Sequence, residues 1–131
     1  MRVWKTTGGG AMKWFAKQKP GDIWDEAIEW PLGDIEAAER IRTICEAAAA
    51  SAAGSARNDK SDTARYERAV KVAMEIAMKI SDGLMRDDAV HRIVDVCMKA
   101  NDIKTAQVLF RAIHASWIRE TVQLDYPTLL Q

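Results

Sequence analysis

The clearest helical pattern in the sequence runs from Tyr66 to Trp117 and reads YERAVKVAMEIAMKISDGLMRDDAVHRIVDVCMKANDIKTAQVLFRAIHASW. Its apolar residues recur in steps of three and four, which is the spacing of one face of an α-helix. Asp82-Gly83 and Asn101-Asp102 are typical signals for the end of a helix and the start of the next one. The stretch therefore predicts three amphipathic helices in succession.

The first and third of these helices resemble each other after a shift of 33 residues. The shift places large, small and basic residues on residues of the same kind: Val70 on Ile103, Lys71 on Lys104, Ala73 on Ala106, Ile76 on Leu109, Ile80 on Ile113, Leu84 on Trp117 and Arg86 on Arg119. A weaker copy upstream repeats the spacing with a shift of 35, at Ile35, Ala38 and Ile41. A period of about 34 is the length of one helix–turn–helix unit in stacked helical repeats.

The run from Ile80 to Ala89, followed by Ala100-Asn-Asp-Ile103 and Ala106, resembles bacterial helical-repeat arrays of the tetratricopeptide-like kind. The resemblance covers about residues 64–120, with an echo at 34–45, and lacks the Trp and Leu-Gly positions of the tetratricopeptide consensus. It implies a scaffold that binds other chains along a groove, and it transfers no catalytic residue. An ordinary antiparallel bundle whose helices look alike by chance stays open as the alternative.

Length and composition predict a single all-α domain over residues 22–131. It is either a small helical bundle or a short helix-hairpin solenoid of about four to five helices. The repeat-like helices are expected at 34–53, 61–82, 86–100 and 102–118, with a mobile loop between the first two. The 19 basic and 19 acidic residues give a formal net charge of zero, which argues against a nucleic-acid footprint spread over the domain.

Residues 1–21 differ from the rest because they are basic and aromatic until the acidic segment begins at Asp22. They are predicted to form a flexible arm that carries Trp4 and Trp14. Two interpretations stay open for this arm. Either its tryptophans pack onto the helices, or it contacts a membrane surface or a nucleic acid.

Cys45 and Cys97 each lie on an apolar helical stripe, far apart in the sequence. They are therefore predicted to be buried free thiols of a cytoplasmic protein. The sequence has no run of about 18 apolar residues that would predict a membrane-spanning helix. It also lacks the apolar core segment of a signal peptide.

Few residues suggest chemistry. His91 and Cys97 are six residues apart, which places them about 240° apart around one helix, so they do not form a nucleophile–base pair. The two histidines, His91 and His114, lack the spacing of a zinc site. Asp87-Asp88 at the start of a helix is explained by the favourable helix dipole. We therefore expect no metal, no cofactor and no enzymatic activity.

The sequence best fits a non-enzymatic module that binds a helix or peptide of a protein partner on its helical-repeat face. Polar residues are expected to line the edges of that face, and a second apolar row of methionines is the candidate contact surface. The predicted partner-binding residues are Lys71, Met74, Met78, Arg86, His91 and Lys104. The alternative is a membrane- or nucleic-acid-associated accessory protein that uses the N-terminal arm.

A short repeat stack has open ends, and the C-terminal region offers apolar residues to cover one of them. The lowest-order closed assembly is a two-fold homodimer in which each tail covers its partner. The residues predicted at that interface are Phe110, Trp117, Leu124, Leu129 and Leu130.

Overall fold

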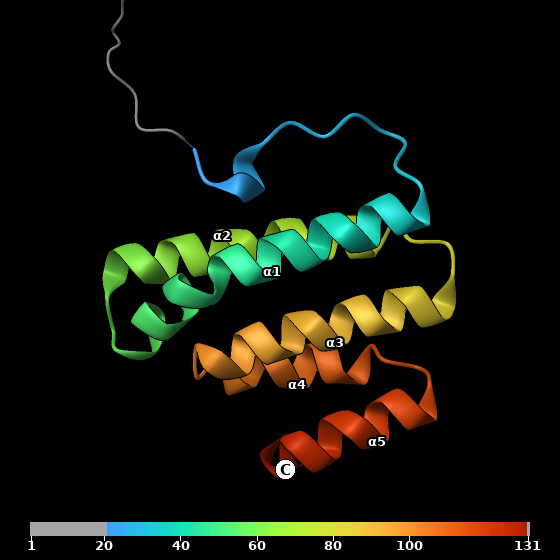
Figure 1. Ribbon diagram of the computed structural model, residues 1–131. Coiled ribbons are helices and arrows are strands. Elements are labelled where there is room, and N and C mark those ends of the chain that lie inside the picture. Colours follow the sequence, from blue (N-terminus) through green and yellow to red (C-terminus); the bar gives the residue numbers. More distant parts are fainter. Residues whose placement is uncertain (1–20, 131) are drawn as a thin grey trace, which may run out of the picture.

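The computed structural model describes residues 21–130, apart from the side chain of Leu130 (Figure 1). In these residues it contains five α-helices, two short 3-10 helices and no strand. The elements are η2 (Ile23–Asp25), α1 (Asp34–Ala56), α2 (Lys60–Ala77), α3 (Gly83–Lys99), α4 (Ile103–Arg111), α5 (Ser116–Asp125) and η3 (Pro127–Leu130). The predicted all-α class is confirmed. Residues 1–20 of the predicted arm lie outside the described residues.

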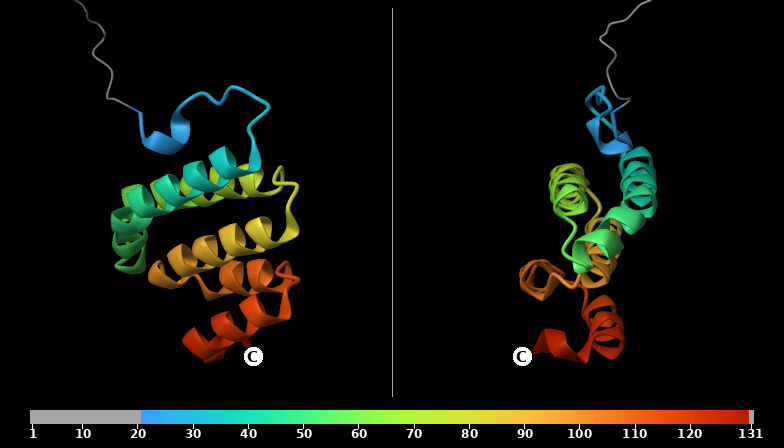
Figure 2. Two further views of the ribbon diagram at one scale, coloured as in Figure 1. Left: turned by 45° about the vertical axis from the view of Figure 1, so that its right-hand side comes forward. Right: turned by 90° about the vertical axis from the view of Figure 1, so that its left-hand side faces the viewer.

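The helices lie in two layers. Viewed along the helix axes, α1, α3 and α5 form one layer, while α2, α4 and η3 form the other (Figure 2, right). Each helix of the first layer is followed in the sequence by its neighbour in the second, and α3 contacts helices on both sides of it. None of the helices between residues 21 and 130 has both the length and the apolar composition that crossing a membrane requires.

The same Asn-Asp turn closes both helical hairpins, α1–α2 and α3–α4. Asn58 and Asn101 adopt left-handed conformations with φ of 66° and 60°, which asparagine tolerates better than most residues. The aspartate that follows each of them caps the next helix: Asp59 accepts from the N–H of Asp62, and Asp102 accepts from the N–H of Thr105. The prediction at Asn101-Asp102 is therefore confirmed.

The first helix is longer than predicted. α1 continues to Ala56 and only three residues separate it from α2, so the predicted mobile loop before Ser61 is wrong. Small residues let the two helices approach closely here, since Ala48, Ala52 and Gly54 are buried against α2. A Cβ atom on Gly54 would overlap the side chain of Asp62. The alanine-rich composition therefore serves close packing rather than a loop.

The last predicted helix, 102–118, is two helices. The chain leaves the helical conformation between α4 and α5 and resumes it at Ser116. The corresponding stretch between α2 and α3, 33 residues earlier, also lies outside a helix. The helix predicted at 61–82 therefore ends at Ala77 rather than at Asp82. These two loops, 78–82 and 112–115, are equivalent positions of the repeat.

The core confirms the 33-residue overlay but not the upstream copy. The equivalent residues Ala73 and Ala106 are 1% and 0% exposed, and Ile80 and Ile113 are both buried. α1, however, lies in the layer of α3 rather than in that of α2 (Figure 2). Matching Ile35 to Val70 was therefore wrong, since Ile35 is 73% exposed.

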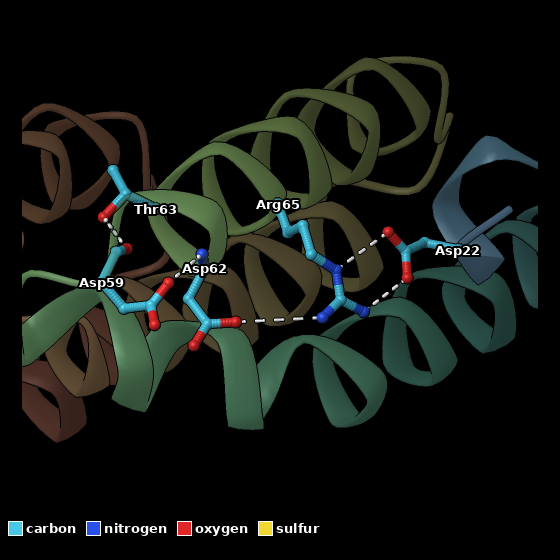
Figure 3. Close-up of polar contacts among 5 residues, drawn as sticks. All are labelled: Asp22, Asp59, Asp62, Thr63 and Arg65. Carbon is cyan, nitrogen blue, oxygen red and sulfur yellow. Dashed lines mark hydrogen bonds and ion pairs between the residues drawn. The ribbon is translucent and has the colours of Figure 1, made fainter. Parts of the chain in front are cut away.

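A short segment covers the α1–α2 end of the stack. Trp24 of η2 is buried, and its ring lies under the guanidinium of Arg65 at 5.6 Å. Arg65 also donates to the carboxylate of Asp22, as Figure 3 shows. Arg68 pairs with Asp25 at 2.6 Å. The acidic segment that follows residue 21 is therefore bound to bases of α2.

Candidate functional site

The candidate site is the edge of the stack where α1, α3 and α5 begin. It lies at the right of Figure 1, together with the loops 78–82 and 112–115 that enter α3 and α5. We call this surface the loop edge. Its geometry follows from interactions that recur from one hairpin to the next.

A carboxylate at the start of one helix binds the loop that leads into the next helix of the same layer. Asp34 of α1 accepts from the backbone N–H groups of Ser81 and Asp82, both at 2.9 Å. Asp87 of α3 accepts at 3.0 and 2.8 Å from His114 and Ala115, which occupy the positions of Ser81 and Asp82 after the 33-residue shift. The loop-binding carboxylates Asp34 and Asp87 thus hold the loops against the layer.

A pair of arginines repeats in the same way. The guanidinium of Arg86 donates to the carbonyl of Ile80 at 3.4 Å, and that of Arg119 donates to the carbonyl of Ile113 at 3.1 Å. Arg119 also lies 4.7 Å from the ring centre of Phe110. Both arginines therefore fix the loop of their own unit, and Arg86 is not a free partner-binding residue.

These roles were not predicted from the sequence. An aspartate at the first position of a helix commonly caps that helix, but the carboxylate of Asp34 binds a loop 47 and 48 residues away. Asp87 was attributed to the helix dipole, yet it is 2% exposed and binds the following loop. The only sequence signal near these contacts is the recurrence of Arg86-Asp87 as Arg119-Glu120 at the 33-residue shift, and it does not include Asp34.

The loop edge also exposes large apolar side chains. Ile35, Leu84 and Trp117, each the second residue of its helix, are 73%, 53% and 61% exposed. Met78 and Trp30 add to this surface, and the ammonium of Lys79 lies 5.6 Å from the Trp30 ring centre. An open groove of about 600 Å³ lies between the starts of α1 and α3; it is lined by Leu32, Gly33, Asp34, Ile35, Glu36, Ser81, Asp82 and Met85.

The predicted partner-binding residues do not form one cluster. Lys71 and Lys104 are exposed at equivalent positions of α2 and α4, and Met78 is 63% exposed. Met74 is partly buried against the core. His91 lies on α3, in the other layer, with its Nε2 atom 3.8 Å from the carboxylate of Asp95.

The predicted dimer interface is also divided. Phe110 and Leu129 are each 5% exposed and belong to the chain's own core, so neither is available to a second copy. Trp117 is exposed on the loop edge, and Leu124 is 82% exposed at the other end of α5. The side chain of Leu130 lies outside the described residues.

The two cysteines are free thiols. Cys97 is fully buried and Cys45 is partly buried. Burial raises the pKa of the Cys45 thiol to about 12 and that of Cys97 to about 11, which favours the protonated form of both at neutral pH. Within residues 21–130, no three His, Cys, Asp or Glu side chains gather closely enough to hold a metal ion.

Comparisons of the chain with protein-family models, curated proteins and solved structures found no match. The tetratricopeptide-like resemblance therefore stays a prediction that rests on the residues quoted for it.

The interaction of Asp34 with the loop predicts an acid-dependent loss of stability. The N–H group of Ser81, and then that of Asp82, lower the pKa of Asp34 below its ordinary value of 3.8. Since the folded pKa lies below the unfolded one, the contribution is present above about pH 4 and is lost as the pH falls through the folded pKa. We expect Asp34→Asn to lower the urea midpoint of unfolding at pH 7. The difference in midpoint between this variant and wild type should be smaller at pH 2. An equal difference at both pH values would contradict this role.

Proposed function

We propose that the chain is a non-enzymatic protein–protein interaction module that binds an amphipathic helix of a partner along the loop edge. The observation that carries this proposal is the row of exposed apolar residues Ile35, Leu84 and Trp117 at the start of three successive helices of one layer. The loop-binding carboxylates hold this row in a fixed arrangement.

Exposed apolar side chains are concentrated on this edge. Of the seven exposed large hydrophobic residues in the described part of the chain, five lie there: Trp30, Ile35, Met78, Leu84 and Trp117. Scattered apolar residues are normal on a protein surface, whereas a contiguous group of them marks an interaction site. Tryptophan is also among the residues that most often dominate binding energy.

The spacing of the row suits a helix. Neighbouring packed helices lie about 8–10 Å apart, so the starts of α1, α3 and α5 present apolar side chains at about that interval. An α-helix rises about 1.5 Å per residue, so residues seven apart are separated by about 10.5 Å. A partner helix lying along the stack would therefore place apolar residues i, i+7 and i+14 on Ile35, Leu84 and Trp117.

The proposal is tested by selecting helical peptides from a displayed library on the full chain and measuring their affinities by fluorescence anisotropy. The selected peptides should carry apolar residues at seven-residue spacing. We expect Leu84→Ala and Trp117→Ala each to weaken binding at least about tenfold, which corresponds to about 1.4 kcal/mol.

Leu124→Ala is the matched control, because Leu124 is also highly exposed on α5 but lies at the end away from the loop edge. It should leave the affinity within about twofold of wild type, a change of less than about 0.5 kcal/mol. If Leu124→Ala weakens binding as much as Trp117→Ala does, the loop edge is not the binding surface.

A further inference from the structure

α5 carries an unused copy of the surface with which α3 binds α5. At the 33-residue shift, Arg119-Glu120 of α5 takes the place of Arg86-Asp87 of α3. The arginine of α5 already makes the equivalent bond, to the carbonyl of Ile113. Glu120 therefore occupies the position from which Asp87 binds two backbone N–H groups of the next loop.

The two residues that would meet a following helix are exposed. The side chain of Glu120 is exposed and has no hydrogen-bond partner among the residues that the structure describes, and Leu124 is 82% exposed one turn later. Residues four apart lie on one face of a helix. Ile118 and Val122 are buried on the opposite side of α5, so Glu120 and Leu124 point away from the stack.

We propose that the outer face of α5 is a docking surface for a helical hairpin of another protein built on the same repeat. A loop of that hairpin donates two consecutive backbone N–H groups to Glu120, and its following helix covers Leu124. The interface continues the two already present, in which Asp34 of α1 binds the loop before α3 and Asp87 of α3 binds the loop before α5.

A second copy of this chain does not supply that loop from its opposite end. There the N–H of Gly33, which precedes α1, is already bonded to the carboxylate of Glu36 at 3.0 Å. The segment around buried Trp24 covers the same end through the pairs of Arg65 with Asp22 and Arg68 with Asp25. Both loops that enter α3 and α5 are also occupied, by Asp34 and Asp87.

The chain's own repeat unit is the probe for this face. The variant consists of residues 1–125 followed directly by a second copy of residues 93–131. Because Asp125 corresponds to Arg92 at the 33-residue shift, α5 is lengthened by the second half of α3. A copy of α4, of the loop 112–115 and of α5 then follows. In this variant Glu120 has the same position relative to the copied loop that Asp87 has relative to the loop 112–115. We expect the copied His114 and Ala115 amides to exchange with solvent at least tenfold more slowly than the same amides when Glu120→Ala is added.

Glu120→Asp in the extended chain is the conservative variant and should keep the protection, because it restores the residue that α3 uses. In the unextended chain, Glu120→Ala should leave the urea midpoint unchanged, because the carboxylate has no partner within residues 21–130. Rapid exchange of the copied amides with Glu120 present overturns the proposal. A lower urea midpoint for Glu120→Ala in the unextended chain also overturns the proposal. This second measurement does not require the extended chain to fold.

Sedimentation of the unextended chain separates a partner hairpin from self-association. The proposal expects a monomer at micromolar concentration. A dimer that Leu124→Glu converts to monomers would show that a second copy occupies the outer face of α5, and would overturn the assignment to another protein.

Discussion

Replacing Asp87 with alanine is expected to lower the free energy of unfolding by about 3 kcal/mol, because two part-buried N–H groups lose their charged acceptor. The carboxylate is 2% exposed, and one of its oxygens accepts from both His114 and Ala115. No other acceptor among the described residues bonds these two N–H groups; Arg119 binds the same loop only at the carbonyl of Ile113. Urea unfolding measures the loss.

Two variants define the cause of that loss. Asp88→Ala removes the neighbouring carboxylate, which is exposed and pairs with Arg92 at 3.5 Å, and should change stability by less than about 0.5 kcal/mol. Asp87→Asn keeps one carbonyl oxygen as an acceptor and should recover part of the loss. If Asp87→Ala and Asp88→Ala are equally mild, the loop is held by other contacts.

Ala73→Leu and Ala106→Leu are expected to destabilise the chain by about 1–3 kcal/mol each, because a larger side chain overpacks a closed helix contact. Both alanines are almost fully buried at equivalent positions of α2 and α4. The space that Ala73 shares with Ile44, Ala48 and Ile93 has no room for a water molecule, so it has none for three further carbon atoms. Thermal unfolding measures the effect.

Ala64→Leu is the control for this pair, because Ala64 is exposed on α2. It should leave the melting temperature close to that of wild type. Unchanged melting temperatures for both Ala73→Leu and Ala106→Leu would mean that the two positions are not closed helix contacts.

The sequence predicted those parts of the fold that local signals determine. The three-and-four spacing placed the helices, and Asn101-Asp102 ended one helix and capped the next. The 33-residue overlay matched Ala73 with Ala106 and Ile80 with Ile113, and both pairs are buried. Helix existence and turn chemistry depend on neighbouring residues, so they can be read from a single sequence.

The errors arose where a distant residue decides the local structure. The break between α4 and α5 has no glycine or proline, and is held open by Asp87, which lies 27 and 28 residues earlier in the chain. Leu84 continued an apolar stripe in the sequence, but α2 ends at Ala77, so Leu84 belongs to α3 and is exposed. The sequence did not predict the loop edge, because its carboxylates bind residues far away in the chain and its exposed apolar residues have no partner close in the sequence.

The most direct test of the proposed function is the map of backbone amide chemical-shift changes when a selected helical peptide binds the full chain. We expect the largest changes at Ile35, Leu84 and Trp117, with small changes on the outer surface of α2 and α4. The largest changes at Lys71 and Lys104 instead would contradict the proposed function, and would place the partner on the α2–α4 layer.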